Sequence, residues 1–494
     1  MKLKVKDIDI SSGGPLIAIM HHKDAEILDL HVMDRIKIKK GNKIETVVVD
    51  IAQSSNLISR RKIGVFEEVI KSMNLKNNDT VDVAIARKPL SIDYIKKKLD
   101  GQQLNKEEIN QIVWDIVHNK LSQIELTYFV AACYTNVMST DETILLTKAM
   151  VKHGNVLKLN KYPVIDKHCI GGIPGNRTTM VIVPIIAAAG YFMPKTSSRS
   201  VTSPAGTADV MEVLANVSFP INKMKDIVLK TNGCIVWGGS LNLAPADDKI
   251  INVERPLEID AESQLLASIM AKKHSVSSTH ILIDVPVGNY AKVKNNFEAR
   301  RLKKEFEKIG KKLRKTVRVL ITDGSQPIGN GIGPALEARD VLWVLKRDPR
   351  RPIDLEKKCL KLCANIFNMI GLKNGHRKAF EILASGKAYE KMIEIIKAQN
   401  GKETAAEDIK IGKFCCDLTT SKSGIVKSIY NLFISRIARI AGAPHDKGAG
   451  IYLHKHVGEK VRRGEKLITI YSESKHEFKY AVDFAKSNKV FVVK

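Results

Sequence analysis

The stretch from Asp166 to Gly190, DKHCIGGIPGNRTTMVIVPIIAAAG, constrains the fold more than any other part of this sequence. A β-branched run, YPVIDKH, leads into it, glycines follow, and an apolar run comes last. This order predicts a strand, a glycine-rich loop and a buried helix. Glycine lets the backbone approach a ligand closely, and a helix N-terminus presents free N–H groups and a positive dipole end. The stretch therefore predicts an anion site.

The side chains around this loop favour phosphate as the anion. Lys167 supplies a positive charge, and Thr178 and Thr179 supply hydroxyls in the first helical turn. The glycine spacing matches neither GxGxxG nor a Walker loop, so neither dinucleotide nor P-loop chemistry follows. A plain structural turn is the alternative interpretation.

A second loop, KTSSRSVTSPAGTAD, follows the strand-like run YFMPKT and precedes a predicted helix, ADVMEVLANV. Hydroxyl groups surround one arginine, Arg199, which suits a phosphorylated sugar because a guanidinium binds phosphate through two hydrogen bonds. Ordinary Ser/Thr turns, with a helix cap at Thr207, are the alternative. The hydroxyl residues are Ser197, Ser198, Ser200, Thr202, Ser203 and Thr207.

A third segment, IDAESQLLASIMAKKHS, predicts a helix preceded by Asp260. Gln264, Ser268 and Lys272 recur every four residues, so they share one stripe beside an apolar face. Such a stripe can line a nucleobase site. The alternative is a solvated stripe, with Asp260 as an ordinary N-cap.

The order of predicted elements divides the 494 residues into several domains. Strands that alternate with helices in the central region predict an α/β fold. We expect a multidomain α/β protein: a helical domain and an α/β mixed-sheet domain forming a cleft, a β-rich N-terminal module and a small α+β C-terminal domain. The expected ranges are 1–88 for the N-terminal module, 89–162 for the helical domain, on which part of the central region packs, 163–412 for the α/β domain and 413–494 for the C-terminal domain.

The formal charge of +27 fits either nucleic acid or an anionic small substrate. The densest basic stretch, 292–318, has the apolar spacing of an amphipathic helix, so its charges predict a solvated face. Aromatic residues make up only 5%, which is poor material for base stacking, and we expect no nucleic-acid partner. No long uncharged apolar run occurs, and the N-terminus resembles a strand, so we expect no membrane partner and a cytoplasmic location. The seven scattered cysteines predict reduced thiols.

Four sequence segments carry a family resemblance: DKHCIGGIPGNRTT, KTSSRSVTSPAGTADVMEV, NLAPADD and LLASIMAKK. Together they resemble the thymidine/pyrimidine-nucleoside phosphorylase family, with the closest similarity to its archaeal branch, which acts on nucleoside 5′-monophosphates. The resemblance covers nearly the whole chain. It implies a cytoplasmic glycosyltransferase of nucleotide salvage that converts AMP and phosphate to adenine and ribose 1,5-bisphosphate, with CMP and UMP as further substrates.

The resemblance also implies roles for individual residues. Asp260 is the expected proton donor, and His168 is a secondary catalytic candidate. Lys167, Thr179, Ser197 and Thr207 match positions that hold the attacking phosphate. The expected nucleotide contacts are Gly172, Ser198, Arg199, Ser200, Val201, Thr202, Ser203, Thr207, Ser268 and Lys292, with Lys272 added from the helical stripe.

Two departures from the family pattern bear on the substrate. Many relatives have serine at the position of Cys169, and the pyrimidine branch has an arginine at the position of Val253, with Arg255 only nearby. The second departure disfavours a strict pyrimidine nucleoside. The alternatives are a thymidine phosphorylase and a Mg²⁺-dependent phosphoribosyltransferase. We expect no metal and no cofactor, because phosphate is itself the nucleophile, and a homo-oligomer, a dimer or larger.

Overall fold

The computed structural model describes residues 1–200, 203–257, 259 and 261–494. This part of the chain forms two compact units. The first unit comprises residues 1–153 and 244–268, and the second comprises residues 154–243 and 269–494. Across the described ranges, no helix is both long and apolar enough to cross a membrane.

The first unit begins with a closed six-stranded barrel, in the order β1-β5-β2-β4-β3-β6. Its interior is apolar because alternate residues of each strand point inward, as the burial of Leu3 and Val5 in β1 shows. The predicted β-rich module is confirmed, and a short helix, α1, is added to it. The elements are β1 (Lys2–Asp7), β2 (Ile17–His21), α1 (His22–Ile27), β3 (Arg35–Lys40), β4 (Lys43–Ala52), β5 (Lys62–Val65), α2 (Glu67–Met73) and β6 (Thr80–Ile85).

A helical bundle completes the first unit. Three of its helices begin with capping boxes, in which an Asn or Ser and the Glu three residues later bond each other's backbone. These sequence signals explain why the helix starts could be predicted. The helices are α3 (Ser91–Leu99), α4 (Lys106–Val117), α5 (Gln123–Thr135), α6 (Thr140–Lys152) and α10 (Pro245–Leu257), together with the first residues of α11 (Glu262–Ser275).

The second unit is built around parallel strands. The order is β11-β10-β7, and a bridge between Val164 and Phe192 places β8 and then β9 beside β7. All these pairings are parallel, so the carboxyl ends of the strands meet at one edge, where α/β proteins bind ligands. The strands are β7 (Ile165–Cys169), β8 (Met193–Ser197), β9 (Gly233–Trp237), β10 (His280–Val287) and β11 (Thr316–Asp323).

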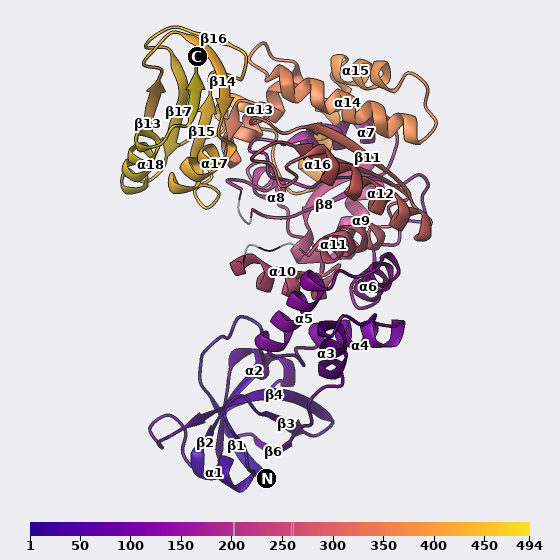
Figure 1. Cartoon of the computed structure of the whole chain (residues 1–494), viewed down its shortest axis with the longest axis vertical. Helices are drawn as coiled ribbons and strands as arrows, with labels where there is room; N and C mark the ends of the chain where they lie inside the picture. The colour runs from indigo at the N-terminus through magenta and orange to yellow at the C-terminus, as the bar shows by residue number, and fades with distance from the viewer. Residues whose placement is uncertain (201–202, 258, 260) are drawn as a thin grey trace. The chain divides into compact units, whose positions relative to one another are not determined.

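Helices cover this sheet, and α7 is buried along almost its whole length. Its residues are apolar all round, which is typical of a helix enclosed by other elements. Helices α14, α15 and α16 pack against α7, while α12 packs on β10 and β11 (Figure 1). The helices are α7 (Thr178–Ala188), α8 (Thr207–Met211), α9 (Ile221–Thr231), α12 (Asn296–Lys312), α13 (Pro334–Lys346), α14 (Ile353–Met369), α15 (Gly375–Ala384) and α16 (Lys387–Ala398).

The C-terminal part of the second unit has antiparallel sheets and two helices, as the α+β prediction requires. One sheet has the order β12-β15-β17-β13 and the other β16-β14-β18. Antiparallel pairing also involves the central region, because β12 comes from it. The elements are β12 (Gly331–Ile332), β13 (Phe414–Thr419), β14 (Gly424–Ile429), α17 (Asn431–Ile440), β15 (Gly450–Leu453), β16 (Lys460–Val461), β17 (Lys466–Ser472), α18 (Lys475–Ser487) and β18 (Phe491–Val493).

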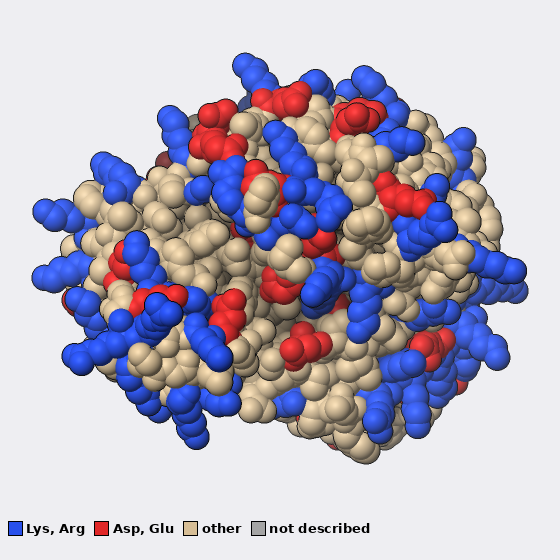
Figure 2. Space-filling view, turned by 90° about the horizontal axis from the view of Figure 1, so that it is seen from above, with Lys and Arg blue, Asp and Glu red and all other residues tan. Residues whose placement is uncertain are grey.

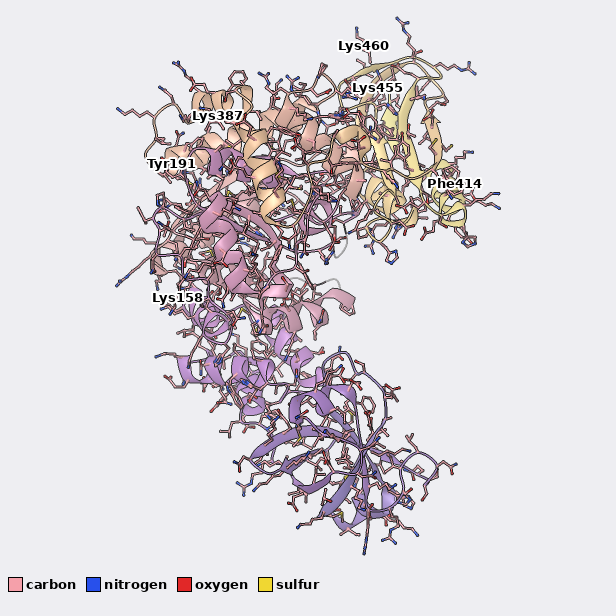
Figure 3. The ribbon with its side chains drawn as sticks, turned by 180° about the vertical axis from the view of Figure 1, so that it is seen from behind. Lys158, Tyr191, Lys387, Phe414, Lys455 and Lys460 are labelled. Carbon is pink, nitrogen blue, oxygen red and sulfur yellow. The ribbon has the colours of Figure 1, made fainter. Side chains whose placement is uncertain are left out.

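Most of the basic side chains lie on the surface. Figure 2 shows Lys and Arg spread over the face in view, with Asp and Glu among them. Lys158, Lys387 and Lys460, labelled in Figure 3, are exposed examples. The amphipathic helix predicted in 292–318 is α12, which buries Phe306 and Ile309. All seven cysteines are free thiols.

Candidate active site

The glycine-rich loop joins β7 to α7 at the carboxyl edge of the sheet. Gly172 and Gly175 have φ values of +90° and +71°, which favour glycine. A Cβ atom on Gly172 would lie 2.5 Å from the backbone nitrogen of Lys292. The structure therefore brings together two residues that the sequence predicted to share a site, and the contact requires glycine.

Lys167 connects the strand before the loop to the helix after it. Its side chain is 1% exposed, and its Nζ atom donates a hydrogen bond of 2.8 Å to Thr178 Oγ1. Thr179, the next residue of α7, is also buried. Lys167 and the two threonines thus meet at the entrance of α7, where the sequence predicted a phosphate.

The hydroxyl-rich loop between β8 and α8 folds around the carboxylate of Asp209. This carboxylate accepts hydrogen bonds from the backbone nitrogens of Ser200 at 2.7 Å and Gly206 at 2.8 Å, and from Arg199 Nη1 at 3.2 Å. A Cβ atom on Gly206 would lie 2.6 Å from Ser198 O. The loop is therefore a tight turn whose shape is set by one acid and one glycine.

The guanidinium of Arg199 is already balanced by carboxylates. Its Nη1 donates to Glu212 Oε2 at 2.8 Å, and Lys447 Nζ lies 2.7 Å from the same oxygen. The hydrogen bonds from Arg199, followed by those from Lys447, lower the pKa of Glu212 to about 2. Arg199 also lies over the ring of Trp237. This arrangement suits a residue that shapes the loop, so the charge for a ligand must come from elsewhere.

The hydroxyl groups of this loop differ in their availability. The hydroxyls of Ser200 and Ser203 are used within the loop, where they donate to Ser203 O and Ala205 O. Ser198 is exposed, and Ser197 Oγ is buried without a hydrogen-bond partner among the described residues. Val201 and Thr202, two further predicted contacts, lie outside the described residues.

Arg177 holds the two loops side by side. It ends the glycine-rich loop, and its guanidinium donates to Thr207 Oγ1 and to Ala205 O, both at 3.1 Å. It also pairs with the buried carboxylate of Glu337. The two segments that the sequence predicted as phosphate-binding loops therefore adjoin each other at the carboxyl edge of the sheet.

A cluster of buried charges adjoins the glycine-rich loop through Lys167. The carboxylate of Asp166 faces Lys273 Nζ at 2.9 Å and Lys195 Nζ at 3.9 Å. The carboxylate of Asp284 faces Lys358 Nζ at 3.4 Å and Lys167 Nζ at 3.7 Å. A buried charge is costly unless it is compensated, and here two carboxylates face the amino groups of four lysines. The excess of lysines over carboxylates suits a bound anion, whose negative charge would favour their protonated forms.

Comparison with known proteins connects this geometry to a family. Three family models match in order: the helical bundle domain of a glycosyl transferase family at residues 92–154, its α/β domain at 161–389, and the pyrimidine nucleoside phosphorylase C-terminal domain at 425–491. AMP phosphorylase of Thermococcus kodakarensis is 45% identical over 98% of this chain and 96% of its own. AMP phosphorylase of Pyrococcus furiosus is 44% identical over the same shares.

The chain belongs to the AMP phosphorylase family. The predicted resemblance, glycosyltransferase class and multidomain fold are thereby confirmed. Among solved structures, anthranilate phosphoribosyltransferase from Thermus thermophilus has a TM-score of 0.53 with 17% identity, and the match covers 63% of this chain and 100% of that one. This likeness concerns the fold.

The helix that carries the family's third segment, α11, contains both predicted and unexpected residues. Ser268 and Lys272 are half-buried on it, and Gln264 is buried. The neighbour of Lys272, Lys273, is 2% exposed and bonds Asp166. Asp260, the predicted proton donor, lies outside the described residues.

His168 and Lys195 sit in a setting that disfavours positive charge. Burial, and then the ammonium groups of Lys273 and Lys195, hold the pKa of His168 well below its usual range. Burial and the nearby Lys273 likewise lower the pKa of Lys195, although Asp166 opposes this. His168 is therefore neutral near pH 7 and suited to hydrogen bonding. An anion that binds nearby would raise both pKa values.

Sequence reasoning missed five residues of the buried cluster: Asp166, Lys195, Lys273, Asp284 and Lys358. One of them had a signal, because Asp284 interrupts the apolar strand HILIDVPV. A charged residue in such a strand indicates a buried ion pair. At the family's variable position, Cys169 Sγ accepts a hydrogen bond of 3.3 Å from Asn176 Nδ2, and burial, followed by the nearby Asp284 carboxylate, raises the thiol pKa.

Proposed function

We propose that this enzyme, a member of the AMP phosphorylase family, converts AMP and inorganic phosphate to adenine and ribose 1,5-bisphosphate, with CMP and UMP as further substrates. The observation that carries the proposal is the pair of adjoining loops, tied together by Arg177, beside a buried excess of lysines. The reaction must hold two phosphates, the attacking one and the 5′-phosphate of the nucleotide. Two loops rich in N–H and hydroxyl donors match that requirement.

In this proposal the two loops together hold the two phosphate groups, and each loop contributes residues to both. Lys167, Thr179, Ser197 and Thr207 bind the attacking phosphate. The nucleotide contacts Gly172 and Lys292, the loop residues Ser198, Ser200, Val201, Thr202, Ser203 and Thr207, and Ser268 and Lys272 of α11. Arg199 acts through the loop that it braces, because Glu212 already balances its charge.

The bond changes follow from these positions. A phosphate oxygen bonds to C1 of the ribose while the bond from C1 to the base breaks, through a transition state with positive charge on the sugar. The departing purine is a better leaving group when a ring nitrogen is protonated, and Asp260 is the proposed donor. His168, in its neutral form, is the secondary candidate for a catalytic role. A helix N-terminus lowers the pKa of a carboxyl, so Asp260 needs nearby anions or burial to stay protonated.

The proposal is tested by incubating the purified protein with AMP, CMP, UMP, adenosine and thymidine, with and without phosphate, and measuring free base. We expect phosphate-dependent release of base from the 5′-monophosphates and much less from the nucleosides. Preference for thymidine would favour a thymidine phosphorylase instead. Excess EDTA distinguishes the phosphoribosyltransferase alternative, because that reaction needs Mg²⁺ and phosphorolysis does not.

We also propose that the protein forms a homo-oligomer, a dimer or larger. Apolar side chains are exposed on the barrel of the first unit: Ile27 by 63%, Val32 by 56% and Met33 by 48%. Such side chains are available to pack in an interface between subunits, and the barrel carries none of the predicted site residues. Light scattering on the wild type and on Val32→Lys tests this, with a lower mass expected for the variant. A monomeric wild type would contradict it.

A further inference from the structure

The ion pair between Asp284 and Lys358 lies beside the end of β7. Asp284 is 0% exposed, and in the sheet it is in register with Cys169, the last residue of β7. Its Oδ1 atom accepts a hydrogen bond of 2.6 Å from Thr322. Its Oδ2 atom faces two ammonium groups, Lys358 at 3.4 Å and Lys167 at 3.7 Å. One carboxylate is therefore shared between two lysines.

Because both lysines face Asp284, Lys358 affects where the ammonium group of Lys167 lies. A single carboxylate balances a single ammonium charge, so Lys358 and Lys167 compete for Asp284. Lys167 has a second partner, Thr178 Oγ1 at 2.8 Å, which holds its Nζ atom at the entrance of α7. Without Lys358, Asp284 would face Lys167 as its remaining nearby cation, and attraction in a buried setting would draw the ammonium group toward the carboxylate.

We infer that Lys358 is a positioning residue for phosphate binding: it neutralises Asp284 and so leaves the charge of Lys167 for the attacking phosphate. This inference rests on the proposed function, in which Lys167 binds that phosphate. Lys358 acts through Asp284 and Lys167, and no contact with substrate is required of it.

The position of Lys358 on α14 supports this role. Its neighbours on the helix, Lys357 and Lys361, are exposed, whereas Lys358 is 9% exposed. Burying an ammonium group is costly, so the residue needs a partner in the interior, and Asp284 is that partner. Burial alone would raise the pKa of Asp284, but the charges of Lys167 and Lys358 lower it, so the carboxylate stays ionised.

A second contact couples α14 to the phosphate-binding end of α7. Cys359, the residue after Lys358, is fully buried. Its thiol donates a hydrogen bond of 3.8 Å to the carbonyl oxygen of Thr178. Thr178 is the residue whose hydroxyl accepts from Lys167. The helix that carries Lys358 is therefore anchored at the same turn that holds the Lys167 ammonium group.

The test measures the binding of phosphate and the binding of AMP separately on the full-length enzyme. In Lys358→Met, the dissociation constant of inorganic phosphate, measured by calorimetry, and the KM for phosphate should rise by about tenfold or more, the scale of a lost buried charge interaction. The KM for AMP should change by less than about twofold, a few tenths of a kcal/mol. Lys358→Arg should restore most of the phosphate affinity. Lys361→Met, an exposed change on the same helix, should leave both constants unchanged.

A second variant keeps the test decisive if Lys358→Met does not fold. Asp284→Asn keeps an oxygen for Thr322 but removes the charge for which the lysines compete. Alone it should bind phosphate as tightly as the wild type or more tightly, and in the Lys358→Met background it should restore phosphate binding. Weaker binding by Asp284→Asn, or unchanged binding by Lys358→Met, would overturn the inference. A wild type that binds no phosphate and splits no AMP would instead overturn the proposed function.

Discussion

Lys167 Nζ donates a 2.8 Å hydrogen bond to Thr178 Oγ1, and this bond joins the strand before the glycine-rich loop to the first turn of the helix after it. The ammonium group is therefore held at the N-terminus of α7, where a helix presents free N–H groups and a positive dipole end. Because both are fixed before a ligand arrives, little reorganisation is needed when phosphate binds.

Removing this charge should abolish phosphate use. In Lys167→Met, kcat/KM for phosphate should fall by about a hundredfold or more, the scale of a lost charged contact in an active site. Lys158→Met is the matched control, since Lys158 is exposed, and its kinetics should equal those of the wild type. Steady-state kinetics with varied phosphate provide the measurement. A Lys167 variant with normal phosphate KM would place the phosphate elsewhere.

The tight turn at Gly206 should be equally sensitive to a small change. Gly206→Ala places a methyl group 2.6 Å from Ser198 O and Ser200 N, so the hydroxyl-rich loop must open. We expect the KM for AMP to rise by about tenfold or more, as is common when a positioning loop is displaced by an ångström. In Gly238→Ala the nearest atom would lie 3.7 Å away, and activity should be retained. Equal kinetics of the two variants would contradict this account.

Acid should weaken the ion pairs that Glu212 forms with Arg199 and Lys447. The pKa of Glu212 is about 2 in the folded protein, against 4.5 for an ordinary glutamate, because of Arg199 first and Lys447 next. A lowered pKa stabilises the fold above pH 4.5, and the contribution is lost as the pH falls from 4.5 toward 2. Relative to Glu212→Gln, the wild type should therefore be more stable at pH 6, by on the order of 1 kcal/mol for a partly exposed pair.

Denaturant unfolding at a series of pH values measures this difference. The advantage of the wild type over Glu212→Gln should shrink steadily below pH 4.5. Glu390→Gln, an exposed change on α16, should follow the wild type at every pH. A difference between the wild type and Glu212→Gln that is constant from pH 6 to pH 3 would show that the carboxylate is not held by these cations.

Asp260→Asn tests the proposed acid. Loss of a general acid typically lowers the rate by about 10²- to 10⁴-fold, and we expect kcat for AMP to fall within this range while the affinity for AMP is kept. Equilibrium binding of AMP and single-turnover kinetics separate the two effects. Turnover by Asp260→Asn close to that of the wild type would remove Asp260 from the mechanism.

The loops of the site were predictable because their chemistry is local. The glycines, Lys167 and the threonines are close in sequence, so one segment contains the whole entrance of α7. The helix predicted over ADVMEVLANV was too long, because α8 ends at Met211. Turn-type hydrogen bonds continue as far as Ala215, and beyond them Gln399, which is 0% exposed, donates from Nε2 to Asn216 O at 2.8 Å, a contact with a remote segment that the local sequence does not reveal.

The buried lysines could not be predicted because their partners lie on segments that are distant in sequence. Lys272 and Lys273 are adjacent, and helical spacing assigned the site to Lys272, whereas Asp166 on a distant strand binds Lys273. Lys358 lies among other lysines of an ordinary amphipathic helix, and only the fold distinguishes it. Phe297 fits the apolar spacing of the stretch 292–318, yet it is 77% exposed, and it lies in the first turn of α12.

The central claim is that two adjoining loops hold two phosphate groups at once, and a crystal structure of the enzyme soaked with AMP and sulfate, as a stand-in for inorganic phosphate, tests it most directly. The account predicts sulfate at the entrance of α7, near Lys167 and Thr179, and the 5′-phosphate of AMP against the loop that Arg199 braces. Density for either anion at another site, with both loops empty, would contradict it.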